Sequence, residues 1–223
     1  MGLLNLLNNP IVFVFSAISL VLAITVHEFA HAWAADKLGD STPRADDRLT
    51  LNPLAHLDPI GTLMIVLVGF GWGKAVVFDP RQLNHPVRDT ALIAFAGPLS
   101  NLILATLLSI LLFIAVEIAP GVVGALQGLP IYIISVNVML AIFNLVPVHP
   151  LDGGKILSAL LPDDLAVEYD RFLFRYGFFV LMALIAPLGP NGSAISALIG
   201  PPISIISTGI IWIGQIVATL FFG

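Results

Sequence analysis

The stretch that decides the fold and the chemistry of this chain is Ile24-Thr25-Val26-His27-Glu28-Phe29-Ala30-His31-Ala32-Trp33. It places two imidazoles and a carboxylate inside one of the most apolar segments of the sequence. On a helix, His27 and His31 project from one face, so both can reach a single zinc ion. Glu28 points about 100° away by the helical repeat, where it meets a water beside the metal more easily than the metal itself. The pattern is typical of a zinc hydrolase.

A histidine in an apolar helix is more often a hydrogen-bonded packing residue than a ligand. That alternative is weak here, because three ionisable groups lie within five residues. A charged group costs about 2 to 4 kcal/mol at the centre of a bilayer, so these groups need a compensating partner. A metal ion is the partner that the spacing favours.

Composition restricts the class of protein. Of 223 residues, 58% are hydrophobic and only 10% are charged, whereas soluble domains carry about 25% charged residues. We therefore expect an integral membrane protein with several spans, and there is no basic patch suited to nucleic acid. The absence of cysteine excludes disulfides, thiolate zinc sites and a cysteine nucleophile. The first ten residues lack a positively charged region, so the apolar run after them is expected to be a retained span.

The apolar runs predict an all-α fold with about five transmembrane helices, a re-entrant or interfacial element and a short β segment. The first run, Ile11 to Ala35, would make a helix of about 38 Å, longer than the ~30 Å hydrocarbon core. Pro59 to Trp72 is short for a span and fits the re-entrant or interfacial element, and Ala75 to Phe78 is expected to form the strand. The other expected spans are 90–116, 130–146, 172–185 and 194–222.

We expect one membrane-embedded domain over residues 1–223, with a catalytic core at about 10–160 and two C-terminal transmembrane helices at about 166–222. If the run at 59–72 does not cross the membrane, all nine lysines and arginines fall on one side. The positive-inside rule then places the N-terminus outside and the C-terminus in the cytoplasm. It also predicts a site near the cytoplasmic face of the cell membrane.

A catalytic zinc usually has three protein ligands and one open position, so the two histidines leave one ligand to be found. The segment from Asn144 to Gly154 contains two prolines and two glycines, which favour an unwound chain that holds Asp152 at membrane depth. Asp152 is therefore favoured, although an acid at this place can also be an ordinary helix cap. The candidates for the third ligand are Asp152, His149, His56, Asp58 and His85.

Three motifs together resemble the site-2 protease family of intramembrane zinc metalloproteases. They are HEFAH at 27–31, AGPLSN at 96–101 and NLVPVHPLDGG at 144–154. Their order and separation also resemble that family, and the likeness covers about 24–156. Small residues in the second motif would let another helix approach closely.

The resemblance implies one Zn²⁺ per chain, with His27, His31 and Asp152 as ligands. It implies that Glu28 is the general base and that Asn144 lies near the scissile carbonyl. The function implied is hydrolysis of peptide bonds in transmembrane protein substrates, within or near the bilayer. Such a substrate must unwind locally, and the predicted strand could pair with it.

Several positions stay open at this stage. Asn101 resembles a polar residue of the family whose role is less defined. His149 occupies a position that commonly holds proline in members of that family. His56 is expected to be a structural loop residue, with a role on the substrate side or in transient metal binding as the alternative. The chain has no room for an inserted PDZ domain or a CBS pair, so a compact catalytic core is expected.

Two other classes of function compete with proteolysis. A zinc-binding scaffold without activity would have no need of Glu28 beside the metal. A metal transporter would place ionisable groups along several helices through the full depth, whereas here they cluster near one face. The two C-terminal spans are expected to form a lateral gate, and the sequence leaves the substrate and the oligomeric state open.

Overall fold

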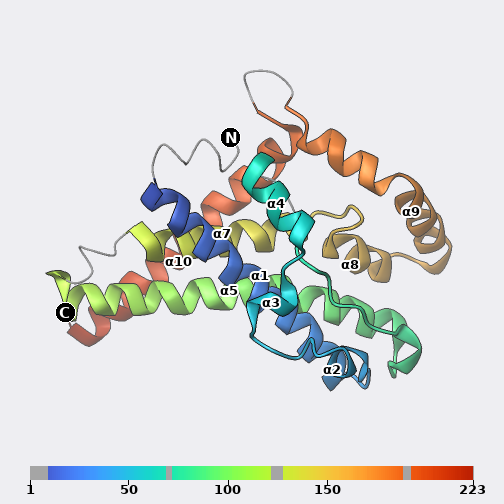
Figure 1. Ribbon diagram of the computed structural model, residues 1–223, viewed down its shortest axis with the longest axis horizontal. Helices are drawn as coiled ribbons and strands as arrows, with labels where there is room; N and C mark the ends of the chain where they lie inside the picture. Colours follow the sequence, from blue (N-terminus) through green and yellow to red (C-terminus); the bar gives the residue numbers. More distant parts are fainter. Residues whose placement is uncertain (1–9, 69–71, 122–127, 188–191, 223) are drawn as a thin grey trace.

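Helices make up almost all regular structure in the computed structural model (Figure 1), which describes residues 10–68, 72–121, 128–187 and 192–222. The long helices are α1 (Pro10–Lys37), α5 (Pro86–Ile118), α7 (Gly128–Asn144), α9 (Asp163–Ile185) and α10 (Ala194–Phe222). The short ones are α2 (Thr42–Ala45), α3 (Pro53–His56), α4 (Pro59–Val68), the 3-10 turn η2 (Pro80–Gln82) and α8 (Asp152–Leu160). The predicted helical class is confirmed.

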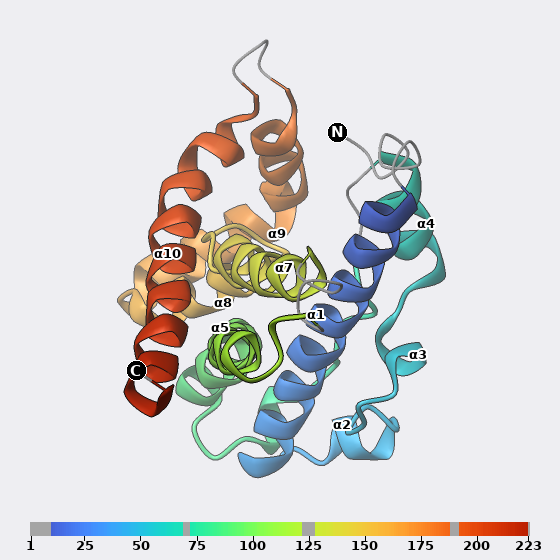
Figure 2. The ribbon, with the colours of Figure 1, turned by 90° about the vertical axis from the view of Figure 1, so that its left-hand side faces the viewer.

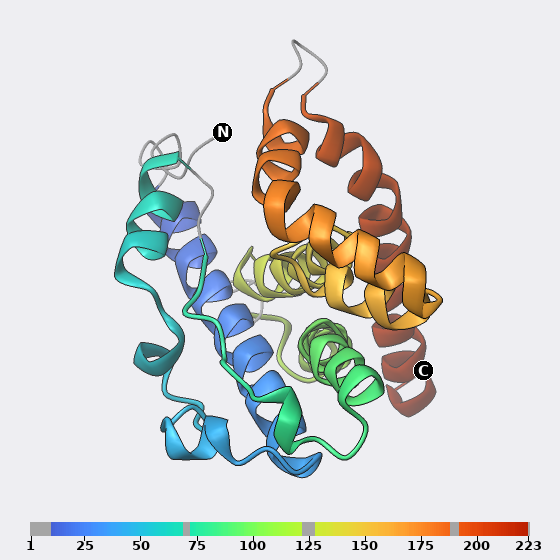
Figure 3. The ribbon, with the colours of Figure 1, turned by 90° about the vertical axis from the view of Figure 1, so that its right-hand side faces the viewer.

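Helix α5 lies at the centre of the arrangement. Figures 2 and 3 look along α5 and α7, which lie side by side, with α1 on one side of them and α10 on the other. The most extensive contacts between helices are those of α5 with α7, α10 and α1, followed by those of α1 with α7. Helix α9 lies further out and contacts α8 and α10. The position of α5 therefore determines how α1, which carries the HEFAH motif, meets the rest of the chain.

Three described helices are long and apolar enough to cross a membrane, namely α1, α5 and α10. Helix α7 is also apolar, but has 17 residues. Helix α9 has 23 residues and begins with two acidic side chains. Large apolar side chains such as Leu107, Leu111 and Leu220 face outward, as expected for a surface that meets hydrocarbon. The chain is an integral membrane protein, and the predicted count of five spans is not confirmed.

The start of α5 differs from the predicted start at residue 90. The helix begins at Pro86, because proline at the first helical position has the required φ and needs no N–H partner. Asp89 lies within the first turn. Its Oδ2 accepts a hydrogen bond of 2.8 Å from the main-chain N–H of His85, the residue that caps the helix.

The region after α3 contains the main correction to the sequence prediction. The expected short element is the ten-residue helix α4, and residues 69–71 at its end lie outside the described part of the chain. Residues 75–78 do not form the predicted strand. The main-chain N–H of Val76 donates instead to the carboxylate of Glu28. A side chain thus forms the hydrogen bond that a neighbouring strand would otherwise form with this main chain. The nearest isolated β-bridge joins Leu57 and Gly73.

Small residues fix the contact between α5 and α10. The buried Ser109 hydroxyl donates to the main-chain oxygen of Ile210 at 3.0 Å. Gly214, one turn further along α10, lies against the same serine, so a Cβ there would be 2.7 Å from the Ser109 carbonyl oxygen. Close backbone approach at small residues is a common means of helix association in membranes.

This contact predicts opposite effects for two glycines of α10. Gly214→Ala should lower the free energy of unfolding by about 1 to 3 kcal/mol, because the added methyl group overpacks the interface. Gly209→Ala is the matched control, because a Cβ at Gly209 meets nothing within 4 Å, and alanine favours the helix by up to about 1 kcal/mol. Unfolding by SDS in mixed micelles measures both. Equal stability of the two variants would contradict the α5–α10 contact described here.

Candidate metal centre

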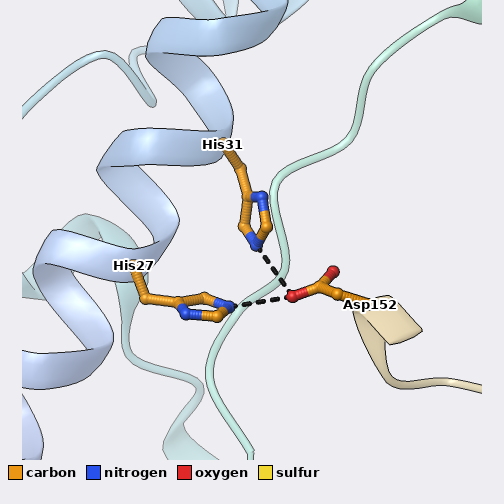
Figure 4. Close-up of side chains that lie close together, drawn as sticks. All are labelled: His27, His31 and Asp152. Atoms are coloured by element: carbon orange, nitrogen blue, oxygen red, sulfur yellow. Dashed lines mark hydrogen bonds and ion pairs between the residues drawn. The ribbon is translucent and has the colours of Figure 1, made fainter. Parts of the chain in front are cut away.

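Helix α1 presents His27 and His31 from one face. The ring centroids are 4.5 Å apart, and the rings are nearly perpendicular at 86°. Both side chains are buried, with 5% and 8% of their surface exposed. Each ring directs its Nε2 atom to the same point (Figure 4), as the spacing of four residues predicted.

The third member of the group is Asp152, which comes from a segment more than a hundred residues away. Its Oδ2 atom lies 3.1 Å from Nε2 of His27 and 3.2 Å from Nε2 of His31 (Figure 4). The chain between α7 and α8 is non-helical over residues 145–151, as the prolines predicted. Asp152 is the first residue of α8, so the unwound segment ends where the carboxylate meets α1.

Hydrogen bonds from α5 fix which nitrogen of each histidine is free. Nδ1 of His27 lies 2.7 Å from Oδ1 of Asn101, and Nδ1 of His31 lies 2.7 Å from the Ile93 carbonyl oxygen. Both partners are acceptors, so each Nδ1 carries the proton and each Nε2 keeps its lone pair. Imidazoles that bind metals are usually held in this way.

The amide of Asn101 is itself held in place. Its Nδ2 donates to the Ala23 carbonyl oxygen at 2.9 Å and to Oδ1 of Asn137 at 2.8 Å. These two bonds leave Oδ1 of Asn101 facing His27. Asn137, which is fully buried, was not predicted from the sequence, although an asparagine inside the apolar run at 130–146 is a signal that could have found it.

Gly97 lets α5 approach the two histidines. A Cβ on Gly97 would lie 2.5 Å from Nε2 of His31 and 2.7 Å from Cε1 of His27. No other residue type fits without displacing the rings. The expectation that small residues of the 96–101 motif allow a close approach is thus confirmed.

Glu28 lies beside the group and is not part of it. Its Oε2 accepts a hydrogen bond of 2.9 Å from the main-chain N–H of Val76. Its other oxygen, Oε1, accepts no hydrogen bond from the part of the chain that the structure describes. The carboxylate is therefore oriented by one oxygen and available for proton transfer at the other.

Asn144 is the last residue of α7, where its Nδ2 donates to the Leu140 carbonyl oxygen at 3.0 Å. Within the described residues, no hydrogen bond joins its side chain to His27, His31 or Asp152. The predicted contact of Asn144 with a substrate stays a prediction.

The other candidates for the third ligand have different surroundings. His56 is fully buried, with Nε2 2.7 Å from the Thr50 carbonyl oxygen. Asp58 accepts from the Gly61 N–H at the start of α4, and His85 precedes α5. His149 lines a groove of about 660 Å³. Burial, followed by the nearby Lys155 charge, lowers the pKa of His149, against the smaller opposite effect of Asp170.

Among the described residues, His27, His31 and Asp152 form a group that could hold a metal ion. Their potential ligand atoms all lie within 4.8 Å of one another. Two neutral imidazole nitrogens and one carboxylate oxygen are a typical ligand set of a catalytic zinc, and they leave an open position. All three residues are buried, and in an apolar helix such groups require a cation or each other as partners. The residues therefore fit zinc.

Buried side chains that could hold zinc, with an adjacent glutamate on a helix long enough to span a bilayer, are typical of membrane zinc metalloproteases. Comparison with known proteins identifies the family. The model of Peptidase family M50 matches residues 122–184. The chain belongs to this family, which is the site-2 protease family.

Several relatives support this assignment. YwhC of Bacillus subtilis is 39% identical over 177 residues, which cover 77% of this chain and 80% of YwhC. Rip2 of Mycolicibacterium smegmatis is 31% identical over 184 residues, covering 78% and 67% of the two chains. MJ0392 of Methanocaldococcus jannaschii is 27% identical over 200 residues, covering 88% and 46%. All three names contain the words zinc metalloprotease. No solved structure gives a significant match.

The contact between Asn101 and His27 predicts a loss of zinc affinity in Asn101→Leu. The variant removes the acceptor that holds the His27 ring, and loss of such a partner typically weakens metal binding about 10- to 100-fold. Competition with a chromogenic zinc chelator measures the affinity. Thr106→Val is the matched control on α5, because the Thr106 hydroxyl bonds only within its own helix, to Leu102. An unchanged zinc affinity in Asn101→Leu would show that this bond does not support the site.

Proposed function

We propose that the protein is an intramembrane protease that uses zinc to hydrolyse peptide bonds of transmembrane proteins, within or near the bilayer. The observation that carries the proposal is the meeting of His27, His31 and Asp152 beside Glu28 on a membrane-length helix. His27 lies about 26 Å along α1 from its first residue and about 15 Å from its last, by the helical rise. A peptide bond cleaved there belongs to a chain that is itself in the membrane.

The three ligands would hold the zinc ion. When bound, zinc polarises the peptide carbonyl and lowers the pKa of water, which makes water a nucleophile at neutral pH. Glu28 removes the proton of the attacking water at its unoccupied Oε1 and delivers it to the leaving amine. Val76 holds the other oxygen of Glu28 during this transfer through its main-chain N–H.

We further propose that Asn144 positions the substrate main chain by its side-chain amide, which requires a different rotamer from the one that bonds Leu140. A donor of this kind is worth about 2.7 to 4 kcal/mol when it stabilises a developing oxyanion. Residues 76–78 offer main-chain groups to a locally unwound substrate, which would add to them as a strand.

The proposed topology has five spans, with α7 and α9 crossing in addition to α1, α5 and α10. The basic residues then lie on the cytoplasmic side, and the metal centre is near that face of the cell membrane. Residues 1–223 act as one membrane-embedded domain in this proposal. The packing of α10 against Ser109 favours α9 as the more mobile of the two C-terminal helices, since α9 has fewer contacts.

The proposal predicts that Glu28→Gln keeps zinc and loses cleavage. Glutamine still accepts from Val76 but cannot take a proton, so turnover should fall about 100- to 10,000-fold. The measurement is cleavage of a single-span substrate by the purified protein in detergent, with zinc content from elemental analysis. Glu168→Gln on the exposed part of α9 is the matched control.

A chelator that removes zinc should abolish cleavage by the unaltered protein, and added zinc should restore it. Normal turnover in Glu28→Gln would refute the role of Glu28. A zinc-loaded, folded protein that cleaves no membrane substrate would favour the scaffold or the transporter instead.

A further inference from the structure

A buried arginine outside the metal centre holds the segment that contacts Glu28. Arg48, from the loop between α2 and α3, has only 6% of its surface exposed. Its guanidinium donates to the carbonyl oxygen of Lys74, and its Nη1 lies 3.4 Å from the carbonyl oxygen of Ala75. Within the described residues no carboxylate pairs with Arg48. A buried charge without a counterion is costly, so these carbonyl contacts are important for keeping it there.

His56 completes the attachment of this loop. Its Nε2 donates to the Thr50 carbonyl oxygen at 2.7 Å, which leaves Nδ1 as an acceptor 3.5 Å from Nη2 of Arg48. The His56 carbonyl oxygen accepts from the Lys74 N–H at 2.8 Å. Loop residues 48–56 and residues 73–75 are thus joined by both side-chain and main-chain contacts. His56 therefore contacts Arg48 and is not part of the group formed by His27, His31 and Asp152.

One peptide group connects Arg48 to Glu28. The carbonyl of Ala75 and the N–H of Val76 belong to the same planar unit, and in a trans peptide they point in opposite directions. Arg48 contacts the oxygen of this unit, and Glu28 accepts from its N–H at 2.9 Å. A cation at the oxygen also polarises the group and strengthens its N–H as a donor.

The far end of the same segment is held independently. The fully buried Asp40 accepts the Asp79 N–H at 2.7 Å through Oδ2 and the Thr42 N–H at 2.9 Å through Oδ1. Residues 74–79 are therefore held at one end by Arg48, from the loop after α2, and at the other by Asp40, from the loop after α1. The position of the Ala75–Val76 peptide depends on Arg48 at one end and on Asp40 at the other.

We propose that Arg48 is a positioning residue for Glu28, acting through the Ala75–Val76 peptide group. This inference rests on the proposed function, because it gives Glu28 the role of proton acceptor. Without the guanidinium, the peptide group is free to rotate, and the carboxylate loses the donor that fixes its orientation. The metal ligands come from α1 and α8, so the loss should affect turnover and leave zinc binding intact.

The test compares Arg48→Gln and Arg48→Lys with Arg44→Gln. Arg44 is the matched control, because it lies four residues before Arg48, in α2, but is exposed and pairs with Asp36. For Arg48→Gln we expect kcat to fall on the order of 10- to 100-fold, as for a small misplacement of a catalytic group. KM should stay within about twofold and zinc should stay at one per chain, since a positioning residue acts on the reactive geometry. Arg48→Lys should be intermediate, because an ammonium cannot donate in the planar fork of a guanidinium.

Hydrogen–deuterium exchange of the peptide covering 74–79 gives a readout that does not depend on activity. Exchange there should be faster in Arg48→Gln than in Arg44→Gln, with α1 and α5 unchanged. Unchanged kcat and exchange in Arg48→Gln would overturn the proposal. So would loss of zinc or a general rise in exchange in both Arg48 variants, since the arginine would then support the fold as a whole. If the unaltered protein cleaves no substrate, the proposed function fails, while the exchange measurement still decides whether Arg48 holds the segment.

Discussion

The structure depends on the meeting of three ionisable side chains in an apolar environment. His27, His31 and Asp152 are each more than nine-tenths buried. They are tolerable there only as partners of one another and of a cation. Because two of these side chains come from α1 and one from the start of α8, this requirement joins segments more than a hundred residues apart in the chain. The non-helical residues 145–151 bring the Asp152 carboxylate to α1.

Helix α5 makes this meeting possible, although it supplies no ligand. Ile93, Gly97 and Asn101 are spaced by four residues, so they lie along one face of α5. The first offers a carbonyl oxygen to His31, the second leaves space for both rings, and the third offers an amide oxygen to His27. One face of α5 thereby determines which ring nitrogen of each histidine carries the proton, and it leaves the space that the two rings occupy.

The grouping of His27, His31 and Asp152 could be predicted from the sequence because its signals are local. The spacing of His27 and His31, and the prolines and glycines around Asp152, each have a physical meaning within a few residues. The contacts of Arg48 with Ala75, and of Asn101 with Asn137, join positions far apart in the chain. Local patterns carry no information on such pairs.

The predicted strand at 75–78 failed for a related reason. A short run of apolar residues such as Ala75 to Phe78 suggests a strand, but it does not identify the groups that form hydrogen bonds with its main chain. Here the side chains of Arg48 and Glu28 bind the Ala75 carbonyl oxygen and the Val76 N–H, so these groups are not paired with a neighbouring strand. The prediction of the number of spans has a similar limit. The apolar stretches of α7 and α9 are of a length that also suits shorter buried helices.

The central claim is that one zinc ion is bound by two imidazoles and the carboxylate of Asp152. X-ray absorption at the zinc edge, combined with elemental analysis, tests it on the purified protein and on Asp152→Ala. The account predicts one zinc per chain, a ligand shell of nitrogen and oxygen with two imidazoles, and a clear loss of zinc in Asp152→Ala. A full complement of zinc with an unchanged spectrum in Asp152→Ala would contradict it.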